Sequence, residues 1–201
     1  MVEISAYKVK ELRNKTNAGM MDCKEALQSA GGNFDKAVEY LRKKGLSAAT
    51  KRSSKAAKEG VVTSYIHMQG RIGVMVEVNC ETDFVARTDD FQAMAKDIAM
   101  QVAATNPRYL KPEDVPAEVL EGERGIYQDQ AKTEGKPEKV WDRIVEGKLK
   151  KYYEDVCLMN QKFVKDMDIT IETYVNNMIA QTGENIVVRR FARFQLGEEM
   201  S

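Results

Sequence analysis

Apolar positions recur along the chain with two different periods, and the change from one to the other marks out helices and strands. In residues 1–45 the apolar residues recur at helical spacing and predict three short helices. Asp22 followed by Glu25 resembles a capping box that starts the second helix, and Gly45 is expected to end the third. Because helices this short are marginal alone, packing against one another must hold them together.

This N-terminal segment resembles a module of the ubiquitin-associated type, which is a partner-binding fold. Met20 and Met21 lie in the first turn of its second helix. Neighbouring positions on a helix diverge by about 100°, so both side chains cannot point inward. We expect one of them to be exposed, as an adaptable contact for a partner protein. The alternative is that both pack between the first and second helices.

From Gly60 onward the apolar residues alternate with polar ones, which predicts strands. Residues 61–68 and 72–79 form a β-hairpin in this interpretation, with His67 near the tip. His67 is most simply an exposed or half-packed residue of the hairpin, and contact with a partner is the alternative. Residues 185–194 predict a third strand beside the hairpin. One face of that strand is expected to carry Ile186, Val188, Ala192 and Phe194.

Apolar stripes at helical spacing predict further helices around these strands, at residues 89–104, 114–134, 138–156 and 170–183. The stripes are expected to pack against the sheet or against a second subunit. The predicted fold class is α+β, with a small three-stranded antiparallel sheet covered by helices. We expect three parts: a three-helix docking module (1–45), a basic helical linker (46–59) and an α+β core domain (60–201). The open sheet edge is compatible with a homodimer.

Charge and composition exclude several classes of protein. Lysine plus arginine and aspartate plus glutamate number 31 each, so no overall charge favours nucleic acid or membrane. Residues 42–58 hold seven basic residues and no acidic one, and we interpret them as a solvated helix. RNA binding there is the alternative, although no aromatic residue is interleaved for stacking. No apolar run is long enough to span a bilayer, and the three scattered cysteines indicate reduced thiols in the cytoplasm.

Candidate catalytic groups are scarce. His67 is the only histidine, which argues against a Ser-His-Asp triad and against a histidine-rich metal site. The chain has no phosphate-binding loop of the Gly-x-x-x-x-Gly-Lys type and no dinucleotide-binding fingerprint. We therefore expect no enzyme activity, no catalytic residue, no metal ligand and no cofactor.

The connector at residues 81–87, Glu-Thr-Asp-Phe-Val-Ala-Arg, is the best candidate for a functional site. It places the carboxylate of Asp83 beside the aromatic ring of Phe84 in a short loop between a predicted strand and a predicted helix. Loops held at both ends by rigid elements often carry function. The alternative is that Phe84 caps the core while Asp83 faces water.

Three segments resemble the elongation factor Ts family, the guanine-nucleotide exchange factors of elongation factor Tu. They run from Leu12 to Lys24, from Glu77 to Arg87, and from Gly183 through the Arg189-Arg190 strand. Asn17 stands where the family usually has glycine, and asparagine also tolerates a left-handed turn. The chain has one sheet set, as in the short form of the family, and that form is taken to work as a dimer.

The resemblance implies a role for each matching residue. In the family, one loop wedges into the nucleotide domain of elongation factor Tu and disturbs its Mg²⁺ site. The residues that match this loop are Thr82, Asp83, Phe84 and Val85. The residues that match the family's docking positions, which bind the N-terminal module to the same domain, are Leu12, Met20 and Met21. His67 occupies a place that belongs to a second contact region in two-copy members. The implied function is nucleotide exchange in translation elongation by a cytoplasmic homodimer that binds elongation factor Tu, without membrane or direct nucleic-acid contact.

Two other classes of function stay open from the residues alone. One is a helical module that recognises a ubiquitin-like or ribosomal partner without exchange activity, and nucleotide-release kinetics separate it from an exchange factor. The other is an RNA-binding protein that uses the basic run at 42–58. A steep salt dependence of RNA binding would support that class.

Overall fold

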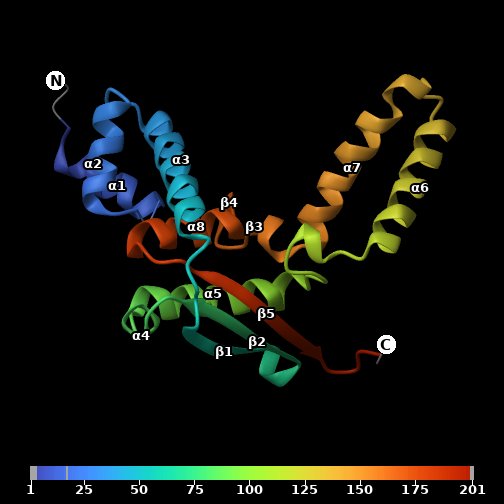
Figure 1. The fold of residues 1–201 in the computed structure, drawn as a ribbon. Coiled ribbons are helices and arrows are strands. Elements are labelled where there is room, and N and C mark those ends of the chain that lie inside the picture. The colour runs from blue at the N-terminus through green and yellow to red at the C-terminus, as the bar shows by residue number, and fades with distance from the viewer. Residues whose placement is uncertain (1–3, 17, 200–201) are drawn as a thin grey trace. The chain divides into compact units, whose positions relative to one another are not determined.

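The computed structural model of this protein describes residues 4–16 and 18–199, so Asn17 lies outside the described residues. The chain groups into two compact units. One contains the residues up to 100 together with those from 172 onward, and the other contains residues 101–171. Three N-terminal helices precede an antiparallel sheet packed with helices, which confirms the predicted α+β class (Figure 1).

The N-terminal helices are α1 (Ala6–Thr16), α2 (Met20–Ser29) and α3 (Phe34–Arg52). They share a small apolar core whose buried members are Val9, Leu12, Cys23, Ala26, Leu27, Ala37 and Leu41. Burial of these side chains supplies the mutual packing that short helices need. Asn33 caps α3, because its side-chain oxygen accepts a hydrogen bond from the Lys36 N–H at 3.0 Å.

The start of α2 differs from the prediction of a capping box at Asp22. The N-cap residue is Gly19, three residues earlier. The carboxylates of Asp22 and Glu25 instead accept hydrogen bonds from the ammonium group of Lys44 on α3. These hydrogen bonds raise the pKa of Lys44 above its ordinary value. A contact between two helices has thus replaced the local cap that the spacing suggested.

The prediction that Gly45 ends the third helix is wrong, since α3 continues to Arg52. Gly45 is buried beside α8 (Ile171–Thr182). A Cβ atom at this position would lie 3.4 Å from Asn177 Oδ1 and 3.6 Å from the Asn176 carbonyl oxygen. Glycine within a helix costs about 0.5–1 kcal/mol relative to alanine. A Cβ atom at these distances would make ordinary van der Waals contacts, so α3 continues through Gly45 at a site packed against α8, and local sequence does not reveal that packing.

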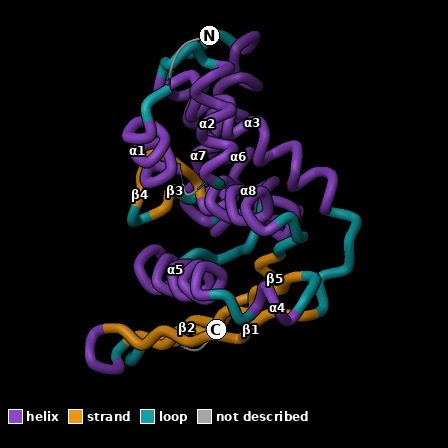
Figure 2. The backbone as a smooth tube through the Cα atoms, turned by 90° about the vertical axis from the view of Figure 1, so that its left-hand side faces the viewer, coloured by secondary structure: helices purple, strands orange, loops and turns teal. Residues whose placement is uncertain are grey.

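The described residues form a three-stranded antiparallel sheet in the order β1 (Glu59–His67), β2 (Ile72–Cys80), β5 (Val187–Gln195). The predicted hairpin and the third strand beside it are confirmed. Helix α5 (Asp89–Thr105) lies along one face of the sheet (Figure 2). The predicted stripe of α5 is fully buried, and it comprises Phe91, Met94, Ala95, Ile98, Ala99 and Val102.

Strand β5 carries a β-bulge at Arg189, where its register against β2 shifts by one residue. A bulge reverses the alternation of side chains beyond it. Val188, before the bulge, is buried, whereas Ala192 and Phe194, beyond it, are exposed. The prediction that these three residues share one face with Ile186 is therefore wrong. Beyond the bulge, Ala192 and Phe194 lie on the outer face of the sheet, whereas Phe191 is half-buried opposite Val76.

The second unit contains α6 (Ala117–Thr133) and α7 (Trp141–Val156), which form an antiparallel helical hairpin (Figure 1). Two short strands, β3 (Lys162–Phe163) and β4 (Asp166–Thr170), pair next to it in sequence. The stripe of α7 was expected to pack on the sheet or on a second subunit. Within the described chain α7 packs against α6, and its contact with a second subunit stays a prediction. None of the helices in the described part of the chain is long and apolar enough to cross a membrane.

Candidate functional site

A tight turn connects β2 to α5, and it contains the single helical turn α4 (Asp83–Ala86). Thr82 is the N-cap residue of α4, and its hydroxyl oxygen accepts a hydrogen bond from the Val85 N–H at 3.4 Å. We call residues 82–85 the Phe84 turn. The structure brings together all four residues that the sequence analysis assigned to the wedge.

The ring of Phe84 is 83% exposed, while Ala86 on the same turn is buried. The alternative that Phe84 caps the core of its own subunit is therefore wrong. Full burial of a phenylalanine side chain stabilises by about 1.5–3 kcal/mol, so this ring offers that much to a surface that covers it. A large aromatic side chain held out on a rigid turn is a typical anchor for a protein partner.

Asp83 also faces solvent from this turn, with 49% of its side chain exposed. Its carboxylate pairs with the guanidinium group of Arg87 at 2.8 Å, one helical turn away. An ion pair this exposed contributes only about 0–1 kcal/mol, so a partner can replace it at little cost. Asp83 can therefore exchange this local contact for polar groups or metal-bound water on another molecule.

Cys80, at the end of β2, makes a hydrogen bond to the backbone of the Phe84 turn. Its buried thiol donates a hydrogen bond to the Thr82 carbonyl oxygen at 3.1 Å. Burial, and secondarily the charge of Glu184, raises the pKa of this thiol to about 11. The thiol therefore stays protonated at neutral pH, and it acts as a hydrogen-bond donor rather than as a nucleophile. Cys23 and Cys157 are likewise buried free thiols.

Glu184 makes a second contact with the turn that the sequence analysis missed. Its carboxylate accepts hydrogen bonds from the backbone N–H groups of Glu81 at 3.1 Å and Thr82 at 3.0 Å. It also accepts a bond from the Thr82 hydroxyl at 2.6 Å. The only signal in the sequence was that Glu184 belongs to one of the three segments that resemble the family.

The docking residues predicted on the N-terminal helices separate into two kinds. Met20 is 48% exposed and Met21 is 74% exposed, so both methionines face solvent where one was expected to do so. The alternative that both pack between helices is wrong. Leu12 is fully buried in the shared core of α1, α2 and α3. While these helices are folded, Leu12 cannot contact a partner directly. It can only stabilise the packing of the helices that carry the two methionines.

His67 lies at the exposed end of β1, next to the turn η1 (Met68–Gly70). Its ring stacks on Tyr65 with centroids 5.7 Å apart, and its Nδ1 lies 3.2 Å from the tyrosine hydroxyl. Met68 and Gln69 in the turn have positive φ angles of 49° and 55°, which are uncommon for residues other than glycine. The hairpin thus fixes His67 at the surface, and its contact with a partner stays a prediction.

The basic run at 42–58 lies largely on α3, and several of its charges are already paired. Lys43 pairs with Glu39, Lys44 with Asp22 and Glu25, and Arg52 with Glu81. These pairs lower the charge available to a nucleic acid. Among the described residues, no group of three or more His, Cys, Asp or Glu side chains is placed to hold a metal ion.

Comparison with known proteins gives matches over nearly the whole chain. The family profile described as "Elongation factor TS" matches residues 6–198. The protein named "Elongation factor Ts" of Syntrophus aciditrophicus is 69% identical over 197 residues, which cover 98% of each chain. Its namesake in Desulfosudis oleivorans is 59% identical over 198 residues, which cover 98% of this chain and 100% of the relative. That of Geobacter sulfurreducens is 56% identical over 197 residues, covering 98% of this chain and 91% of the relative.

Proposed function

Because the chain belongs to the elongation factor Ts family, the nucleotide exchange factors of elongation factor Tu, we propose that it releases GDP with the Phe84 turn. Family membership makes the protein an exchange factor rather than an enzyme, so it binds elongation factor Tu and forms no covalent bond. Its place of work is the bacterial cytoplasm, where translation elongation occurs. The exposed ring of Phe84 is the observation that carries the proposal.

An exchange factor works by linkage between two ligands of one protein. The factor and GDP must weaken each other's binding to elongation factor Tu by the same ratio. To lower the affinity for GDP ten-thousandfold requires about 5.5 kcal/mol of coupling free energy. Phe84 supplies a share of it, because its ring is buried only in the complex that has opened around the nucleotide pocket. That share is about 1.5–3 kcal/mol.

Asp83 acts beside Phe84 on the metal that holds the nucleotide. Mg²⁺ demands near-ideal octahedral geometry and keeps several water ligands, so small displacements around it weaken its binding. The carboxylate of Asp83 is half exposed and is held only by a surface ion pair. Once inserted, it competes for the polar groups and the water around Mg²⁺.

The N-terminal helices provide a second grip on the same domain of elongation factor Tu. Residues 1–45 form the docking module, residues 46–59 the linker and residues 60–201 the core in this proposal. Met20 and Met21 make the contact, and Leu12 holds the helices that carry them. A docked module raises the effective concentration of the Phe84 turn at its target. His67 at the hairpin tip is an additional contact.

Asp83→Ala is expected to slow the stimulated release of GDP about fivefold at millimolar Mg²⁺, because one polar interaction of about 1 kcal/mol is lost. When a chelator has removed Mg²⁺, the difference from the unaltered protein should fall below about twofold. Stopped-flow release of a fluorescent GDP measures both rates. Asp89→Ala, at an exposed acidic residue of α5, is the control and should match the unaltered protein. If Asp83→Ala slows GDP release equally with and without Mg²⁺, Asp83 does not act through the metal.

The double variant Met20→Ala/Met21→Ala is expected to weaken binding to elongation factor Tu about 30-fold, since each truncation removes contact area worth about 1 kcal/mol. Both side chains are exposed, so the fold should be unchanged by circular dichroism. Isothermal titration calorimetry measures the affinity. Leu46→Ala, at another exposed apolar side chain on α3, is the control. Unchanged affinity of the double variant would show that the module docks through another surface.

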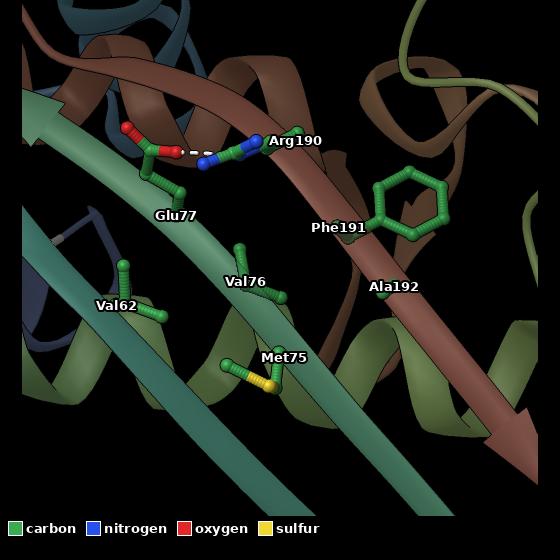
Figure 3. A pocket seen from close by; sticks show the side chains of 7 residues that line it. All are labelled: Val62, Met75, Val76, Glu77, Arg190, Phe191 and Ala192. Atoms are coloured by element: carbon green, nitrogen blue, oxygen red, sulfur yellow. Dashed lines mark hydrogen bonds and ion pairs between the residues drawn. The ribbon is translucent and has the colours of Figure 1, made fainter.

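The outer face of the sheet is the surface on which we propose that the protein forms a homodimer. Its exposed apolar side chains are Val62, Ile66, Met75 and Phe194. Two of them, Val62 and Met75, also line a shallow hollow of about 240 Å³ in this face, together with Ala192 (Figure 3). At one end of the hollow, Arg190 donates a hydrogen bond to Glu77 at 2.7 Å.

A second copy of the chain is the occupant that fits this face best. Two sheets pack face to face through interdigitating side chains, about 10 Å apart. A two-fold axis through the face brings each apolar patch against its own copy, which is how homodimers most often assemble.

A further inference from the structure

The segment after α8, Gly183 to Ile186, lies against the start of the Phe84 turn although 102 residues separate Glu184 from Thr82. Gly183 has a positive φ of 71°, which ends α8 and turns the chain toward β2. The inference drawn from this contact rests on the proposed role of the Phe84 turn in exchange.

Glu184 holds the turn through two backbone N–H groups and the hydroxyl of Thr82. One carboxylate oxygen accepts both backbone N–H bonds, from Glu81 and Thr82, and the other accepts the Thr82 hydroxyl. Hydrogen bonds to an ionised carboxylate are roughly twice as strong as those between neutral groups. The three bonds fix the two residues that immediately precede Asp83.

The contact is reciprocal, which ties the two segments together more firmly. The Glu81 carboxylate accepts a hydrogen bond from the Asn185 N–H at 2.7 Å, and it lies 3.6 Å from the Arg52 guanidinium group. The buried side chain of Asn185 donates to the Lys55 carbonyl oxygen at 2.7 Å. Each carboxylate thus satisfies the backbone of the other segment, and Arg52 provides a positive charge beside Glu81.

We infer that Glu184 is a positioning residue of nucleotide exchange, whose carboxylate presents Phe84 in the geometry that enters the partner's nucleotide domain. A wedge held at its base loses less conformational entropy on insertion than a mobile loop does. Because the turn is held rigidly, its insertion displaces groups of the partner rather than deforming the turn itself. Glu184 acts through the turn and makes no contact with the nucleotide.

Glu184→Ala is expected to lower the maximal rate of stimulated GDP release about fivefold, because it removes all three bonds to the turn. The factor concentration that gives half of this rate should stay within about twofold, since docking through α2 is retained. Glu184→Gln should restore the rate to within about twofold of the unaltered protein, because its amide oxygen still accepts backbone N–H bonds. Glu172→Ala, at an exposed glutamate in the first turn of α8, is the matched control.

A double-mutant cycle of Glu184→Ala and Phe84→Ala distinguishes a positioning role of Glu184 from a general structural role. In the Phe84→Ala background, Glu184→Ala should change the rate less than about twofold, because the residue through which it acts is gone. A full deficit in both backgrounds would overturn the inference. A normal rate for Glu184→Ala, with a slow Phe84→Ala, would overturn it while leaving the proposed function intact. A normal rate for Phe84→Ala would overturn the proposed function itself.

A milder variant covers the case in which Glu184→Ala fails to fold by circular dichroism. Glu184→Asp keeps the charge but withdraws it from the turn by one methylene group. It is expected to slow maximal release about threefold, because the three hydrogen bonds lose their geometry. A rate equal to that of the unaltered protein would count against the inference.

Discussion

Replacement of Phe84 by alanine is expected to slow GDP release from elongation factor Tu, at saturating factor, by about 10- to 100-fold. The range corresponds to the loss of about 1.5–3 kcal/mol of burial, which in the proposed function the ring gains only in the opened complex. The side chain is 83% exposed in the free protein, so its removal leaves no cavity in its own subunit. Stopped-flow fluorescence of a labelled GDP measures the rate.

Two further variants make the result on Phe84 specific. Phe84→Leu retains much of the apolar area and should recover most of the rate. Ile126→Ala removes a side chain that is also exposed, on α6, and should leave the rate unchanged. The role of the ring is refuted if Phe84→Ala releases GDP as fast as the unaltered protein while its circular dichroism spectrum is native.

A charge in the middle of the outer sheet face is expected to abolish the proposed homodimer. Met75 lies on the central strand, opposite Ser64 on β1 and Ala192 on β5, and is 51% exposed. Met75→Glu would bury two unpaired carboxylates in the interface, one from each copy. At several kcal/mol for each ion, the dissociation constant should rise at least about 100-fold. Sedimentation equilibrium over a range of concentrations measures it.

Met167→Glu provides the matched control for the dimer. It makes the same substitution at a methionine of β4 that is 65% exposed in the free chain. We expect Met167→Glu to sediment as the unaltered protein does, and Met75→Glu to sediment as a monomer. A monomeric unaltered protein, or a Met75→Glu variant that still dimerises, would count against the sheet-face interface.

The elements that sequence alone predicts best are those set by local periodicity. The stripe of α5 is fully buried as its spacing indicates, and β1 and β2 pair as the alternation and the turn predict. The errors have tertiary causes. The bulge at Arg189 depends on register against another strand, and Gly45 lies inside a helix at a position packed against α8. Neither cause leaves a local pattern.

The candidate site shows the same division. The Phe84 turn was predicted because a carboxylate and an aromatic residue stand between two regular elements, and the exposure of Phe84 agrees with that prediction. Leu12 was assigned to docking through the family resemblance, but the structure buries it in the core shared by α1, α2 and α3. Glu184 was missed because its partners lie more than a hundred residues away, and only folding brings them together.

Titration of the Phe84→Ala variant with elongation factor Tu, in its nucleotide-free and its GDP-bound forms, tests the central claim most directly. The ring is claimed to be buried only after the nucleotide pocket opens. Affinity for the nucleotide-free form should therefore fall by about 10- to 100-fold, while affinity for the GDP-bound form stays within about twofold. An equal loss of affinity for both forms, or no loss for either, would contradict the account.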